Sequence, residues 1–147
     1  MHFYYLGSRN EDAWVKLPSG LYQAADDILV RVKDEYDYHY TFSILPGFVT
    51  DGGSVPKVFR WFVPSWSGTN HVINLAYACH DGVYATACMP RLFGDDLLRG
   101  MLRDAGLSRA RASSVCWAVN NFACRHYGPE YDHLGSGPFF RMTKYKI

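Results

Sequence analysis

Three separate segments of this chain carry side chains that can meet at one polar site. Asp51 follows a short predicted strand and precedes the pair Gly52-Gly53, whose conformational freedom allows the backbone to approach a ligand closely. His80 and Asp81 lie late in a predicted helix, and Asp95 lies in the next predicted helix. An imidazole surrounded by carboxylates can bind a divalent metal ion or transfer protons, so these residues are candidates for metal binding and acid–base catalysis.

Each of these residues also has a structural explanation. Asp51 can accept hydrogen bonds from nearby backbone amides in a turn, and Ser54, a candidate binding residue, can instead cap the next predicted helix. An ionisable pair within an apolar helix must find partners, because an unpaired buried charge is strongly destabilising. A network of His80 and Asp81 with an arginine such as Arg91 would provide those partners, and we favour it over metal ligation.

Helical geometry separates the remaining candidates. At about 100° per residue, Asp95 lies at the margin of the apolar stripe of its helix, whereas Asp96 points away from that stripe and is expected to be solvated. Tyr84 lies one turn after His80 on the same face, which makes Tyr84 a second candidate binding residue. The metal-ligand hypothesis therefore names His80, Asp81 and Asp95, with a divalent metal of unknown identity as the cofactor.

The elements that must position these residues change along the chain from predicted strands to predicted helices. Short runs of β-branched and aromatic residues predict antiparallel strands in the first fifty residues, among them 27–33, 38–44 and 48–50. Apolar residues then recur with helical spacing, which predicts helices over 55–63, 69–84, 92–105 and from the cap Ser108 to Gly128. The tail 139–145 alternates as an edge strand does. This order predicts one α+β domain over residues 1–147, with N-terminal antiparallel strands, a bundle of about four helices and a C-terminal edge strand.

Composition narrows the function classes. The chain has 147 residues, 48% of them apolar, which is enough for one domain with a core. Its formal charge is only +1, so it lacks the basic character of a dedicated nucleic-acid binder, and we expect no nucleic-acid partner. The sequence shows neither a membrane span nor a secretion signal, so we expect synthesis and folding in a cytoplasm. Eleven tyrosines and four tryptophans favour protein partners, including a second copy of this chain.

Several motifs resemble the domain-of-unknown-function family numbered 1353. They are the segment T-D-G-G-S-V-P at 50–56, the pattern His80-Asp81-x-x-Tyr84, and Arg91 placed four residues before Asp95. The similarity spans about residues 48–128. Members of that family occur widely in tailed phages and prophages, so the resemblance implies a viral or prophage origin and supplies no established activity.

Two function hypotheses lead, and a third is nucleic-acid contact through Trp117 and the arginines in the later third of the chain, which predicts a steep salt dependence of binding. The first is a small phage protein that acts through protein contacts, as a virion component or assembly partner, with its polar cluster organising the fold. The second is a metal-dependent hydrolase acting on peptidoglycan or a phosphoester, in which Asp51, His80, Asp81 and Asp95 are ligands or general base and Arg91 stabilises an oxyanion.

Overall fold

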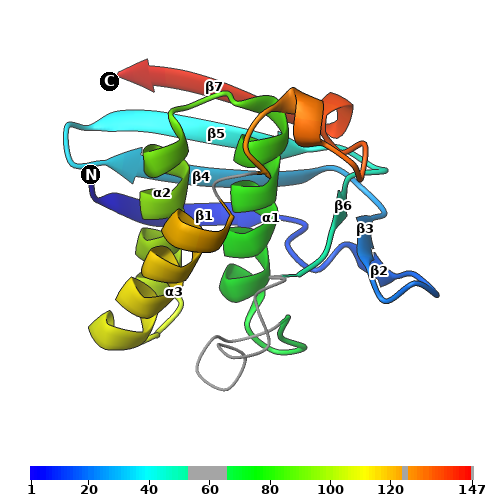
Figure 1. Cartoon of the computed structure of the whole chain (residues 1–147), viewed down its shortest axis with the longest axis horizontal. Coiled ribbons are helices and arrows are strands. Elements are labelled where there is room, and N and C mark those ends of the chain that lie inside the picture. Colours follow the sequence, from blue (N-terminus) through cyan, green and yellow to red (C-terminus); the bar gives the residue numbers. More distant parts are fainter. Residues whose placement is uncertain (53–65, 124–125, 147) are drawn as a thin grey trace.

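The computed structural model describes residues 1–52, 66–123 and 126–146. In these residues six strands come first, three α-helices follow, and a seventh strand ends the chain (Figure 1). The α+β class, the N-terminal antiparallel strands and the C-terminal strand are therefore confirmed. The prediction of about four helices is slightly off, since the described residues form three, and the helix predicted over 55–63 lies outside them.

The main sheet has four antiparallel strands in the order β1-β4-β5-β7. Alternating apolar residues on the central strands turn one face of this sheet to the core, as the buried side chains of Val30 and Phe42 show. The C-terminal strand pairs with β5 along its whole length, from Ile44 opposite Phe140 to Tyr38 opposite Lys146. The bounds of the four strands are β1 Phe3–Arg9, β4 Ile28–Asp34, β5 Tyr38–Ile44 and β7 Phe140–Lys146.

A second, smaller sheet has three strands, of which the last precedes the helices in the chain. It consists of β2 (Trp14–Lys16), β3 (Tyr22–Ala24) and β6 (Val49–Thr50), in that order. Strand β6 ends at Thr50, which is fully buried. Its position places the hydroxyl of Thr50 against helix α1, where it contributes to the polar site described below.

The helices lie on one face of the main sheet, on the near side in Figure 1, where the first two contact the strands and the third packs against the second. Helix α1 (His71–Thr86) is buried around most of its circumference, which agrees with its apolar composition. Helix α2 (Arg91–Asp104) is followed by Gly106 with φ +107°, and helix α3 (Arg109–Phe122) is capped by the predicted Ser108.

Helix α3 ends earlier than the sequence indicated. We expected Gly128 to close it, but the helix ends at Phe122. The backbone N–H of Gly128 instead donates to the carbonyl of Tyr84, at 2.8 Å, which ties this part of the chain to α1. Two short 3₁₀ helices, Pro129–Tyr131 and Gly137–Phe139, then lead to β7.

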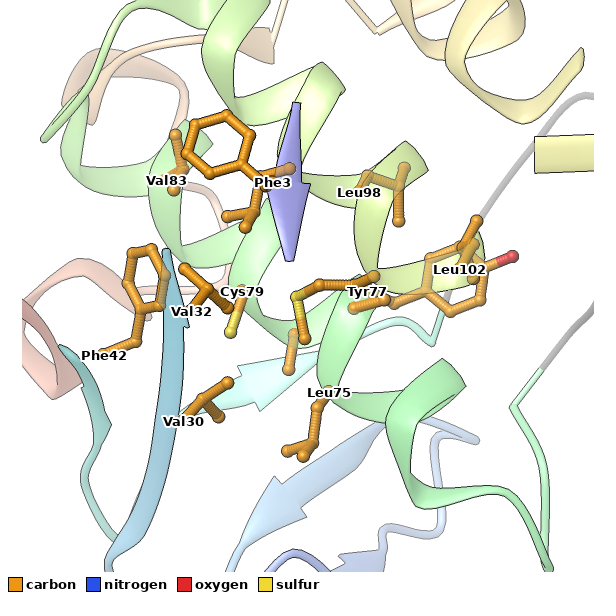
Figure 2. Close-up of a cluster of buried hydrophobic side chains, with 14 of the residues drawn as sticks. Phe3, Val30, Val32, Phe42, Leu75, Tyr77, Cys79, Val83, Leu98 and Leu102 are labelled. Carbon is orange, nitrogen blue, oxygen red and sulfur yellow. The ribbon is translucent and has the colours of Figure 1, made fainter. Parts of the chain in front are cut away.

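The core forms where the sheet meets α1 and α2. Figure 2 shows Phe3, Val30, Val32 and Phe42 from the sheet beside Leu75, Cys79, Val83, Leu98 and Leu102 from the helices. Helix α2 approaches β1 so closely that a Cβ atom at Gly100 would lie 2.3 Å from the carbonyl oxygen of Phe3. A glycine is therefore required at this crossing. No helix among the described residues is long and apolar enough to cross a membrane.

Candidate functional site

A buried polar network joins α1 to α2 around His80. Its Nε2 lies 2.8 Å from Oδ1 of Asp95, and because a carboxylate only accepts, Nε2 is the donor. The same oxygen of Asp95 accepts from the hydroxyl of Tyr84 at 2.6 Å. Nη1 of Arg91 lies 3.5 Å from the other oxygen, Oδ2. Asp95 is 0% exposed, so these three neighbours replace its hydration.

Helical spacing explains why these four side chains meet. His80 and Tyr84 lie four residues apart on α1, and Arg91 and Asp95 lie four residues apart on α2. Residues at this spacing occupy the same face of a helix, so each helix presents a pair to the other. The rings of His80 and Tyr84 pack with their centroids 4.2 Å apart.

Asp81 extends the network from the core to the surface. Its Oδ1 lies 4.0 Å from Nδ1 of His80, a distance at which the two interact by charge and do not form a direct hydrogen bond. Its Oδ2 accepts a hydrogen bond from the hydroxyl of Thr50 on β6. The side chain of Asp81 is 28% exposed, so solvent reaches this end of the network.

The electrostatic environment keeps His80 protonated. Burial alone lowers the pKa of His80, but its interactions with Asp81 and Asp95 outweigh burial and raise the pKa to about 9. At neutral pH the ring is therefore an imidazolium between two carboxylates. A protonated imidazole has no free lone pair, so His80 in this state neither ligates a metal nor accepts a proton.

The network opens onto a cavity of about 530 Å³. The segment after α3 forms one wall, and the others come from α1, α3, the end of β6 and Leu98 of α2. Its apolar lining includes Val49, Ala85, Val119 and Phe122. Its ionisable lining consists of Asp51, Tyr77, His80, Asp81, Tyr84, His126, Tyr131, Asp132 and His133.

The structure brings most of the sequence-predicted residues together. His80, Asp81, Asp95, Arg91 and Tyr84 all belong to the network described above. Asp51 lines the same cavity from an exposed position. Ser54 lies outside the described residues.

Asp96 differs in part from the expectation of a solvated carboxylate. Its side chain is only 20% exposed, and its oxygens lie 3.3 Å from the N-terminal amine of Met1 and 3.3 Å from Arg99. The amine reaches Asp96 because β1, at the start of the chain, packs beside α2. This contact joins residues that are far apart in the sequence, so helical geometry alone does not reveal it.

Two contributors to the site were not predicted. Thr50 forms the hydrogen bond to Asp81, whereas the sequence had drawn attention to the neighbouring carboxylate of Asp51. Asp132 organises the wall formed by the later loop, since its carboxylate accepts from the backbone N–H groups of Ser136 at 3.0 Å and Gly137 at 2.7 Å. The Gly- and Ser-rich sequence after Asp132 is typical of such turns, but it does not reveal where the turn lies in the fold.

The described residues give no support to the metal-ligand hypothesis. No three His, Cys, Asp or Glu side chains among them are placed to hold a metal ion. In the proposed set, Nε2 of His80 is already hydrogen-bonded to Asp95. Metal binding by that nitrogen would require loss of its proton and of this hydrogen bond.

Comparisons with known proteins identify one family. A family model described as "Protein of unknown function (DUF1353)" matches residues 23–119, which is more than half of the chain. The matched span contains Thr50, His80, Asp81 and Asp95, and it ends before the wall that carries Asp132. A search of curated proteins and a search of solved structures returned no match.

Proposed function

We propose, from the premise that the chain belongs to the DUF1353 family of proteins of unknown function, that it acts through contacts with other proteins. In this proposal it is a phage-type virion component or assembly partner. The observation that supports the proposal best is an exposed aromatic surface beside the cavity. In this proposal the side chains of the polar network beside the cavity bind one another, and the network organises the fold.

The aromatic surface consists of Trp117, Phe122 and Tyr131, which we call the aromatic rim. These side chains are 55%, 48% and 51% exposed. The rings of Trp117 and Phe122 pack edge to face with centroids 5.9 Å apart, and Phe122 and Tyr131 line the cavity. Exposed aromatic residues beside a largely apolar pocket are typical of the anchor regions of protein interfaces.

Particle association tests this proposal. We expect quantitative mass spectrometry to find the protein in stoichiometric amount in gradient-purified particles of a phage that encodes it. Trp117→Ala is expected to lower incorporation about tenfold or more, because central interface tryptophans commonly contribute about 2 kcal/mol or more.

Val15→Ala is the matched control for this experiment. Val15 is a 50% exposed apolar residue on β2 and does not line the cavity. Its substitution is expected to leave incorporation unchanged. Absence of the wild-type protein from particles, or equal incorporation of the Trp117 variant with an unchanged melting temperature, would contradict the proposal.

A hydrolase that uses the same cavity is the second candidate. The observation that favours it is the cavity itself, since about 530 Å³ lies within the range of small-molecule sites and Asp81 and His80 lie on its wall. In this candidate a divalent metal would assist hydrolysis of peptidoglycan or a phosphoester.

Elemental analysis with an Asp81→Asn variant separates the two candidates. For an interaction protein we expect no stoichiometric Zn, Mn or Fe after purification without chelator. We also expect the variant to lose about 1–3 kcal/mol of stability, because it weakens the hydrogen bond from Thr50 and removes a charge beside His80. A stoichiometric metal, together with a stably folded variant that has lost hydrolytic turnover, would favour the hydrolase.

A further inference from the structure

The main sheet has a second face, on the side opposite the helices. Side chains alternate between the two faces of a sheet along each strand. The residues that stand between the core residues in sequence therefore point to this second face. Strand register places them in rows across the sheet, and one row runs Tyr4, Lys33, His39, Tyr145. We call this side the open face; its side chains are Tyr4, Arg9, Leu29, Arg31, Lys33, His39, Thr41, Ser43, Arg141, Thr143 and Tyr145.

The open face concentrates positive charge in a chain of formal charge +1. Within the strands it carries Arg9, Arg31, Lys33 and Arg141 and no Asp or Glu side chain, while Asp27 and Glu35 lie just beyond the two ends of β4. The three arginines are exposed, and within the part of the chain that the structure describes none of them forms an ion pair. Nζ of Lys33 lies 3.8 Å from Oδ1 of Asp37, which belongs to the turn at the edge of the face. The partner that complements such a face is an anion with several charges.

Aromatic rings accompany these cations. The rings of His39 and Tyr145 stack with centroids 5.4 Å apart, and Tyr145 is 42% exposed. Tyr4, at the opposite edge of the same row, is 45% exposed, with the ammonium group of Lys33 5.9 Å from its ring centroid. With strands about 4.8 Å apart, the two tyrosines lie about 14 Å from each other across the sheet.

We infer that the open face binds single-stranded nucleic acid. Arginines supply phosphate contacts, and exposed rings supply surfaces on which unpaired bases stack. Bases in a duplex are already stacked and would leave the tyrosines unused. An anionic membrane would favour a large apolar surface, whereas the aliphatic side chains here are Leu29 on β4 and the 43% exposed Leu6 at the bulge in β1. The expectation of no nucleic-acid partner used total charge, which does not record how charge is distributed over the folded surface.

Fluorescence anisotropy with labelled twelve-nucleotide poly-U and poly-dT tests the inference. We expect binding that weakens about 20- to 50-fold between 50 and 200 mM salt, since three or four phosphate contacts give a slope of about −2 to −3. Arg31→Ala is expected to reduce that slope by about 0.7. Tyr145→Ala is expected to weaken binding at least about fivefold through lost stacking.

Arg109→Ala is the matched control for charge, because Arg109 is an exposed arginine on α3, away from the sheet. Trp117→Ala tests whether nucleic-acid binding is independent of the proposed protein interface. Both variants are expected to bind the oligonucleotides as the wild type does. The inference is wrong if neither oligonucleotide binds at 50 mM salt, or if Arg109→Ala weakens binding as much as Arg31→Ala. It is also wrong if a duplex binds equally well and Tyr145→Ala has no effect, or if only anionic vesicles bind.

Discussion

Replacing Asp95 with asparagine is expected to lower the free energy of unfolding by about 3–5 kcal/mol, the range for breaking a buried ion pair by removing one partner. The substituted amide would keep the shape of the side chain and remove its charge. His80, Tyr84 and Arg91 all direct donors at this carboxylate. Without it, the buried imidazolium of His80 loses its closest counterion. Urea unfolding followed by circular dichroism measures the loss.

The neighbouring residue provides a matched control. Asp96→Asn makes the same chemical change one position along α2, where the side chain is 20% exposed and pairs with Met1 and Arg99. Ion pairs that solvent still reaches contribute about 0–1 kcal/mol, so this variant is expected to lose much less stability than Asp95→Asn. Equal effects of the two substitutions would show that the network around Asp95 does not organise the fold.

The stability of the protein is expected to fall as pH rises from 6 to 9. The pKa of His80 is about 9 in the folded chain and about 6.5 in an unfolded one. Because the folded pKa is the higher one, the imidazolium contributes fully below pH 6.5, and its contribution is lost as pH rises through 9. A difference of this size corresponds to about 3 kcal/mol over that range.

Unfolding measured across this pH range in His80→Gln tests the assignment. The variant has no imidazole at this position, so the part of the slope that belongs to His80 is expected to vanish. His133→Gln removes an exposed histidine from the same cavity and is expected to keep the wild-type slope. Nuclear magnetic resonance titration gives a direct check. A His80 resonance that titrates near pH 6.5 would contradict the charged state.

These two experiments also bear on function. A hydrolase that used His80 as a metal ligand or general base would need the neutral ring near neutral pH. The two carboxylates favour the charged ring instead. A large stability effect at Asp95 with a high pKa at His80 would therefore support a structural role for the network and favour the interaction protein over the hydrolase.

Much of the fold could be predicted from local sequence. The runs 27–33 and 38–44 form β4 and β5, and the alternating tail forms β7. Helical periodicity located α1 and α2 to within about two residues at each end, and Ser108 caps α3 as expected. The end of α3 was missed because a contact with Tyr84, distant in sequence, fixes Gly128.

The sequence by itself determined which elements form and which of their faces are apolar, because backbone preference and side-chain periodicity are properties of neighbouring residues. It therefore also placed His80 with Tyr84 on a common helix face, whereas Arg91 preceded the predicted helix 92–105 and shares a face with Asp95 because α2 begins at Arg91. Only the tertiary structure decided that Thr50 binds Asp81, that His80 is charged, and that four cations share the open face. Each of these depends on contacts or strand register between distant segments, and burial and electrostatic fields arise only when those segments pack together.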